Sequence, residues 1–153
     1  MAVLPYPAKP AQAVAGLPGL VHFFEHLGPQ DLPRLGEFYA PDAHFKDPFN
    51  DVRGLLAIEA IFAHMFCAMA SPRFVVLSQM ASGNQAFLVW DLRFQFQGQQ
   101  AWHTIHGATH LSFDAQGLVL DHRDYWDAAE ELYEKLPVLG GIMRWLKRRV
   151  AKG

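Results

Sequence analysis

Two carboxylates in this chain stand where a side chain could move a proton. Asp47 lies in the segment FKDPFND, directly before Pro48 and among aromatic residues. Asp124 lies in LDHRDYW, two residues after His122, so that on a strand both side chains share one face. Burial among aromatic side chains favours the protonated acid, which suits a group that gives and takes protons near neutral pH. The pattern predicts that Asp47 and Asp124 divide acid and base roles, with His122 as their partner.

Each of these residues also has a purely structural interpretation. An aspartate before proline starts turns well, because its side chain accepts hydrogen bonds from nearby backbone amides, and Asp47 fits that pattern. His122 and Asp124 fit a buried polar pair that only satisfies its own hydrogen bonds. Both interpretations stay open at the level of sequence.

The residues support a metal site or a nucleophilic cysteine less well than they support proton transfer by carboxylates. A metal site needs three ligands that converge, and the chain has eight histidines. His103 and His106 are three apart on a predicted strand, so they point to opposite faces, while His106 and His110 share the face away from the predicted pocket. Cys67 is the single cysteine and lies on an apolar helix, where thiols are usually inert. We expect no metal and no cofactor.

The composition limits the kind of protein. Over 153 residues, 51% hydrophobic and 18% charged side chains indicate one globular domain, and 13% aromatic residues exceed what a core of this size needs. The net charge is −2. Five basic residues fall in the last ten positions, which leaves the rest of the chain with a net charge of about −7. A body of that negative charge argues against nucleic-acid binding. The start resembles neither a secretory signal nor a membrane span, so we expect a cytoplasmic protein.

The spacing of apolar residues predicts the elements that position these side chains. A period near 3.6 predicts helices over 19–27, 28–39 and 55–69, and near the end over 127–135 and 138–150. Strict alternation predicts four strands over 74–81, 86–97, 101–113 and 118–126, joined by short turns into an antiparallel meander. The order predicts an α+β domain over 19–136, preceded by a loosely ordered arm over 1–18 and followed by a basic amphipathic helix over 137–153.

The turn DAQG decides how the last two strands pair. A two-residue loop would set Thr109 opposite His122, whereas a three-residue loop with Gly117 in the left-handed region would set His110 opposite His122. A shift by one residue exchanges the two faces of a strand. The first register turns His122 and Asp124 to the same side of the sheet as Thr109, and from the residues alone both registers stay open.

The segments FYAPDAHFKDPFNDVRG, AIEAIF and FDAQGLVLDHRDYWD together resemble the nuclear transport factor 2-like superfamily, in particular ketosteroid isomerases and SnoaL-like polyketide cyclases. The resemblance covers about Phe23 to Asp127. It implies a cone-shaped fold, in which a curved antiparallel meander is covered by three N-terminal helices, and an apolar pocket between the layers. It also favours the first register of the last two strands, which turns His122 and Asp124 toward the pocket and sets Trp126 at a ligand-contacting position of the isomerases. The C-terminal helical tail that the periodicity predicts lies beyond the part that the resemblance covers.

The resemblance assigns roles to particular positions. Asp47 stands where the isomerases have their proton-abstracting base, and Asp124 resembles the last-strand acid of the cyclases. The isomerases' carbonyl-polarising tyrosine and aspartic acid fall on Phe23 and Thr109, and removing one such donor typically costs about 10²–10³ in rate, so steroid isomerisation is disfavoured. The predicted ligand-contacting residues are Phe23, Tyr39, Phe62, Trp90, Phe94, Thr109 and Trp126.

The sequence therefore predicts a small-molecule pocket protein. The favoured function is proton transfer, as an isomerase or cyclase, on a small apolar ligand that carries a carbonyl group or a ring. The alternative is a non-catalytic ligand-binding or protein-interaction module, docked by its basic tail, with membrane contact as a weaker option for that tail. We also expect a homodimer, formed through the outer sheet face or the tail, and no nucleic-acid partner.

Overall fold

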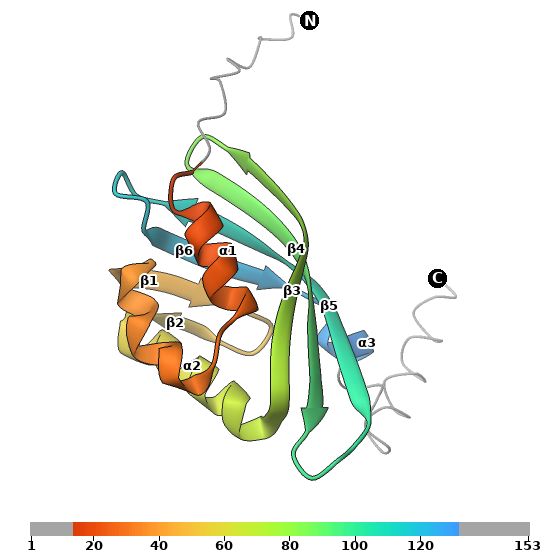
Figure 1. Ribbon diagram of the computed structural model, residues 1–153. Coiled ribbons are helices and arrows are strands. Elements are labelled where there is room, and N and C mark those ends of the chain that lie inside the picture. The colour runs from red at the N-terminus through yellow and green to blue at the C-terminus, as the bar shows by residue number, and fades with distance from the viewer. Residues whose placement is uncertain (1–13, 132–153) are drawn as a thin grey trace, which may run out of the picture.

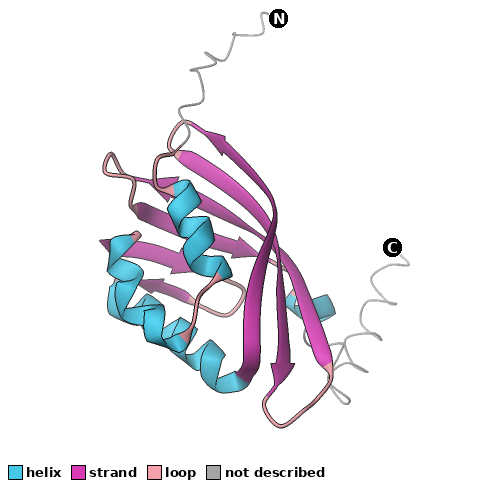
Figure 2. Cartoon of the chain, in the orientation of Figure 1, coloured by secondary structure: helices cyan, strands magenta, loops and turns pink. Residues whose placement is uncertain are grey.

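The computed structural model describes residues 14–131 (Figure 1). They form one sheet of six strands in the order β2-β1-β6-β5-β4-β3, with the N-terminal helices on one face (Figure 2). The helices are α1 (Leu17–Glu25), a 3₁₀ helix (Pro29–Glu37), α2 (Leu55–Ala68) and the short α3 (Ala128–Glu131). The strands are β1 (Tyr39–Lys46), β2 (Asp51–Arg53), β3 (Met69–Ser82), β4 (Gln85–Phe96), β5 (Trp102–Phe113) and β6 (Val119–Tyr125).

The three predicted N-terminal helices are present, with local differences that the residues explain. α1 begins at Leu17, earlier than predicted, with a proline in its first turn. The second helix is 3₁₀ rather than α, because Pro33 lies inside it and removes a backbone donor. Of the predicted 127–135 helix only α3 is described, and the basic helix over 137–153 lies outside the described residues. None of the helices within residues 14–131 is both long and apolar enough to cross a membrane.

The sheet is mixed, which corrects the prediction of a purely antiparallel meander. The meander is found in β3 to β6, but β1 and β2 add to it, and β1 runs parallel to β6. The backbone amide of Val119 donates to the carbonyl of Phe38 (2.8 Å), at the start of that parallel pairing. The register of β1 shifts between Tyr39 and His44, where Pro41 and an exposed aspartate interrupt the alternation. This interruption hides β1 from a search for period-two patterns.

The pairing of β5 with β6 corrects both registers considered from the sequence. Thr109 lies opposite Asp124, and Leu111 lies opposite His122. The carboxylate of Asp114 accepts hydrogen bonds from two amides of the turn, Gly117 has φ +83°, and the ladder shifts between Ser112 and Phe113. The turn pairs Phe113 with Val119, as the three-residue loop with left-handed Gly117 would, and the irregularity between Ser112 and Phe113 adds one more residue, so the rest of the ladder is shifted by two relative to the favoured register. Because a shift by two preserves the faces, the predicted inward-facing side chains still point inward.

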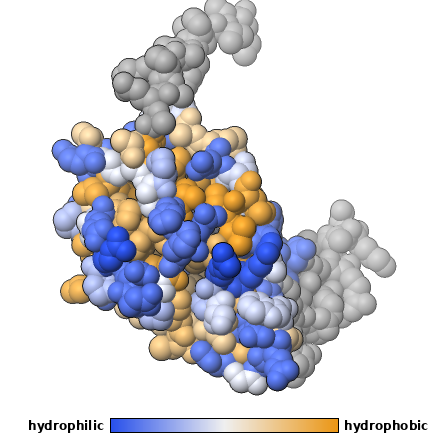
Figure 3. Space-filling model, in the orientation of Figure 1, coloured by the Kyte–Doolittle hydropathy of each residue, from blue (hydrophilic) through white to orange (hydrophobic). Residues whose placement is uncertain are grey.

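The core lies between the helices and the inner sheet face. The α2 side chains Ile58 and Phe62 are buried against it, and α1 adds Leu20, Phe23 and Phe24. The carboxylate of Glu25 on α1 accepts a hydrogen bond from the Val76 amide (3.0 Å) at an irregularity of β3, and so ties the helix to the edge strand. Figure 3 shows hydrophobic surface in the region of β3 and β4 on the side that carries the helices.

Candidate active site

A chain of hydrogen bonds joins five side chains from four strands below the helices. The Trp90 indole N–H donates to Thr109 Oγ1 (2.7 Å), and Thr109 Oγ1 donates to Asp124 Oδ1 (2.5 Å). His122 Nε2 also contacts Asp124 Oδ1 (2.8 Å), and its Nδ1 contacts the Tyr39 hydroxyl (2.7 Å). Thr109, His122 and Tyr39 are buried, with His122 at 4% exposure. The arrangement fixes one carboxylate oxygen of Asp124 and leaves the other available.

The protonation state of this chain follows from its end at Tyr39. Burial, and then the negative charge of Asp124, raise the pKa of Tyr39 well above its usual 10.0, so the phenol keeps its proton. The hydroxyl is buried and its hydrogen needs an acceptor, which is His122 Nδ1. His122 is then the neutral tautomer with its proton on Nε2, and that N–H donates to Asp124. The charge of Asp124 is therefore hydrogen-bonded by two neutral donors but not neutralised.

Asp124 faces a cavity of about 640 Å³, a size that suits a drug-sized molecule. Within residues 14–131, Asp124 Oδ2 has no hydrogen-bond partner, and the side chain is 17% exposed. A smaller space of about 30 Å³, enough for about one water, adjoins Asp124, Thr109 and His122. The free carboxylate oxygen thus lies between the hydrogen-bonded chain and an open, largely apolar chamber.

Helix α2 supplies one wall of this cavity. Its lining residues recur at helical spacing and are mostly small or apolar: Ala57, Ala60, Ile61, Phe62, His64, Met65 and Ala68. The opposite wall comes mainly from the sheet and from the turn after β1, with Phe45, Phe74, Trp90, Leu92, Phe96, Ile105, Phe49 and Trp126. Of the α2 wall, only Phe62 was predicted from the sequence as a ligand contact. The available signal was that α2 is apolar around its whole circumference, which a helix with only one buried face does not need.

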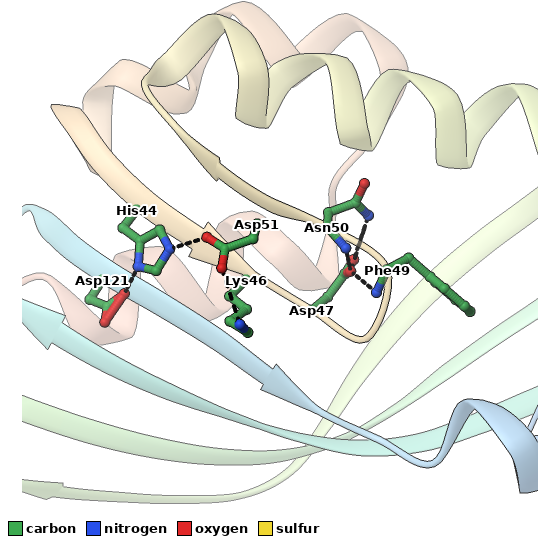
Figure 4. Close-up of polar contacts among 7 residues, drawn as sticks. All are labelled: His44, Lys46, Asp47, Phe49, Asn50, Asp51 and Asp121. Atoms are coloured by element: carbon green, nitrogen blue, oxygen red, sulfur yellow. Dashed lines mark hydrogen bonds and ion pairs between the residues drawn. The ribbon is translucent and has the colours of Figure 1, made fainter.

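Asp47 lies at the mouth of the same cavity, but its carboxylate is engaged (Figure 4). Its Oδ1 accepts hydrogen bonds from the backbone amides of Phe49 (2.7 Å) and Asn50 (2.6 Å), and the Asn50 side-chain amide contacts both oxygens at 3.0 Å. These contacts hold the turn from Pro48 to Asn50. The turn presents Phe49 to Trp126, with ring centroids 5.5 Å apart in an edge-to-face arrangement, and both rings line the cavity.

The SnoaL-like domain family matches residues 20–122, which is well over half of the chain. This protein belongs to the SnoaL-like family. No functionally curated protein matches it significantly.

Solved structures share the fold of this SnoaL-like protein at low sequence identity. A hypothetical protein of ketosteroid isomerase-like fold from Catenulispora acidiphila, in complex with trimethylamine, is 14% identical with a TM-score of 0.66, over 77% of this chain and 89% of that one. A proposed SnoaL-like polyketide cyclase from Jannaschia sp. CCS1 is 18% identical with a TM-score of 0.66, over 84% and 94%. An LEH-like epoxide hydrolase from M. tuberculosis is 13% identical with a TM-score of 0.62, over 92% and 96%. These likenesses establish the nuclear transport factor 2-like fold.

Only some of the ligand contacts predicted for this SnoaL-like domain lie at the cavity. Phe62, Trp90 and Trp126 line the large cavity, and Thr109 lines the adjoining small space. Tyr39 is fully buried and lines neither space; its hydroxyl contacts His122, which lines the small adjoining space. The other two predicted contacts, Phe23 and Phe94, are buried in the core and lie outside the cavity lining; Phe23 packs against Phe24 and Phe38.

The histidines outside the chain of hydrogen bonds contact other partners. His106 Nδ1 contacts the Asp91 carboxylate (2.8 Å), and His110 Nε2 contacts the Gln85 side-chain oxygen (2.7 Å), both on the outer face of the sheet. His103 packs against aromatic rings at the end of β5, and its buried Nε2 has no hydrogen-bond partner among the described residues. Within residues 14–131, no three metal-ligating side chains come together.

A second polar cluster fastens the edge of the sheet, and the sequence did not predict it. His44 Nδ1 contacts Asp121 of β6 (2.8 Å), and its Nε2 contacts Asp51 of β2 (2.6 Å; Figure 4). The Lys46 ammonium donates to the second oxygen of Asp51 (3.0 Å). The hydrogen bonds from His44 and then Lys46 lower the pKa of Asp51 below its usual value. This cluster joins β2, β1 and β6, and so it supports the strands that carry Tyr39 and Asp124.

Proposed function

We propose that this SnoaL-like protein transfers a proton within a small apolar ligand that carries a carbonyl group or a ring, as an isomerase or a cyclase. The observation that supports the proposal is the free Oδ2 of Asp124, which lies in a cavity of about 640 Å³ while Oδ1 accepts two hydrogen bonds. Relatives of the same fold include a protein of ketosteroid isomerase-like fold and a proposed polyketide cyclase.

Asp124 is the acid–base group in this proposal. Ionised Asp124 takes a proton at Oδ2 from the carbon beside a ligand carbonyl; the C–H electron pair passes to the ligand as an enolate, and the same oxygen returns the proton to another atom. Thr109 and His122 stabilise the carboxylate before the transfer. Asp47, whose oxygens are engaged by its own turn, stays a predicted second carboxylate, and the experiment below separates the two residues.

The experiment measures exchange of the hydrogens beside the carbonyl of a probe ketone, 1-tetralone, in deuterated buffer by NMR. Because general acid–base catalysis contributes about 10²–10⁴-fold, Asp124→Asn should remove catalysed exchange almost completely. Asp47→Asn is the matched control, since it makes the same chemical change at the cavity mouth. Equal exchange by wild type and Asp124→Asn would reject Asp124 as the proton-transfer group, and loss confined to Asp47→Asn would reassign the role to Asp47.

The second candidate is a non-catalytic ligand-binding or interaction module. It is favoured by Phe23 and Thr109, which stand where the resemblance places the carbonyl-polarising tyrosine and aspartic acid of the isomerases, so that neither of these strong oxyanion donors is present at those positions. It is supported if both aspartate variants bind 1-tetralone as wild type does and none of the three proteins catalyses exchange. Docking by the basic tail is rejected if removal of Val138 to Gly153 leaves association with a partner or with anionic vesicles unchanged.

We also propose that the protein is a homodimer whose contact is the outer face of the sheet. Met80 and Phe87 lie opposite each other on β3 and β4, are 60% and 36% exposed, and give this face an apolar region beside polar pairs. Sedimentation at micromolar concentration should give the mass of a dimer, and Phe87→Glu should give that of a monomer. A wild-type monomer would reject the proposal.

A further inference from the structure

The lining of the large cavity is apolar but carries charge of one sign. Of its twenty described lining residues, two are carboxylates, Asp47 and Asp124, and none is lysine or arginine. Seven are phenylalanine or tryptophan, whose faces are the negative part of an aromatic ring. A ligand inside this cavity meets no fixed positive charge from residues 14–131, and it meets an ionised carboxylate whose second oxygen is free.

Neither carboxylate is neutralised by a neighbour. Asp124 receives its two hydrogen bonds from the Thr109 hydroxyl and from neutral His122, whose other nitrogen is occupied by the Tyr39 hydroxyl. Asp47 receives hydrogen bonds from backbone and side-chain amides of its own turn. The cationic side chains nearest in the sequence, Lys46 and Arg123, are absent from the cavity wall but line an adjoining surface cleft that shares Asp47, Asp124 and Trp126 with it. Within residues 14–131, Lys46 pairs with Asp51, the Arg123 guanidinium lies over the Tyr125 ring, and neither forms an ion pair with Asp47 or Asp124.

We propose that the cavity selects its ligand by charge: it accepts uncharged apolar carbonyl or ring compounds and excludes those with a carboxylate or phosphate on the part that enters. The proposal rests on the proposed function, since it uses the same cavity and the same ionised Asp124. An anion placed a few ångströms from Asp124 would be repelled, because the Asp124 side chain is only 17% exposed and charges that are partly buried are screened much less than exposed ones. A neutral ketone of the same shape meets no such repulsion and gains the whole apolar contact.

The test compares 2-acetylnaphthalene with 2-naphthoate, which have nearly the same shape and differ in charge. Binding to the full chain is followed at pH 7 by quenching of tryptophan fluorescence, because Trp90 and Trp126 line the cavity. The neutral ketone should bind tighter than the carboxylate by roughly ten- to a hundredfold, the range expected for two like charges several ångströms apart in a partly buried site. Asp124→Asn should bring the two affinities within about threefold, chiefly by improving binding of the carboxylate.

Asp42→Asn is the matched control, because Asp42 is an exposed carboxylate on β1 outside the cavity lining, so the same loss of one negative charge should leave the preference unchanged. Equal binding of the two probes to wild type would overturn the inference, and so would a preference that persists in Asp124→Asn. Failure of 2-acetylnaphthalene to bind would also overturn it. These outcomes are independent of turnover: loss of proton exchange in Asp124→Asn, together with binding of 2-naphthoate to wild type as tight as that of 2-acetylnaphthalene, would keep the proposed function and reject charge selection.

Discussion

Replacing Tyr39 with phenylalanine tests the chain of hydrogen bonds behind Asp124. The change removes one oxygen from a fully buried side chain and otherwise preserves its shape, so little new cavity forms. His122 Nδ1 then loses its 2.7 Å partner within a ring that is only 4% exposed. A buried polar atom left without a partner costs about 1–3 kcal/mol, so the free energy of unfolding should fall by that amount. For a chain of this size, the melting temperature should fall by about 3–9 °C.

The assay is urea denaturation followed by tryptophan fluorescence, with thermal melting as a second measurement. Tyr125→Phe is the matched control, because it removes the same oxygen from a half-exposed tyrosine at the end of β6 and should change stability by less than about 0.5 kcal/mol. The double variant with His122→Phe should lose less than the sum of the single changes, because neither partner is then left alone. If Tyr39→Phe and Tyr125→Phe are equally stable, the hydroxyl of Tyr39 does not donate to His122 in solution.

Other expectations follow from the same contacts. Because burial raises the pKa of Tyr39, only the unfolded chain ionises this phenol above about pH 10, so stability should decline as pH rises past that value, and the decline should be shallower in Tyr39→Phe by alkaline denaturation. Because its hydrogen bond from His44 lowers the pKa of Asp51, this carboxylate stabilises the fold above its usual pKa and stops doing so as pH falls; Asp51→Asn should flatten the acid limb of the stability curve. Gly107→Ala should cost about 1–3 kcal/mol in urea denaturation, since its new methyl group would lie 2.5 Å from the Trp90 ring.

The faces of the strands could be predicted from the sequence, whereas their partners could not. Alternation in LDHRDYW places His122 and Asp124 on one face whichever residues lie opposite, and the structure has them side by side. The partners depend on the turn after Phe113, where left-handed Gly117 gives the three-residue loop, and on an irregularity between Ser112 and Phe113 that shifts the rest of the ladder by one more residue. Turn geometry depends on hydrogen bonds that a list of residue types does not contain.

The first strand shows a second limit of sequence reasoning. The alternation of β1 is interrupted near Pro41. The strand pairs in parallel with β6, which lies more than seventy residues later in the chain, so no local pattern in the sequence indicates this pairing. The Tyr39–His122 contact depends on that pairing and could not be foreseen. For Asp47 the sequence left two interpretations open, because an aspartate before proline fits a turn and a base equally well; its contacts are those of a turn, at the edge of a cavity.

The parallel pairing of β1 with β6 has a consequence for how the protein folds. The contact between Tyr39 and His122 joins residues 83 positions apart, while β3, β4, β5 and β6 pair with their immediate neighbours in the chain. Contacts between distant residues cost more loop entropy and tend to form late, so the meander can assemble before β1 closes onto it. Partly folded chains would then hold Asp124 without the neighbours that orient it. Recovery of ligand binding after dilution from denaturant should accordingly lag behind recovery of the sheet.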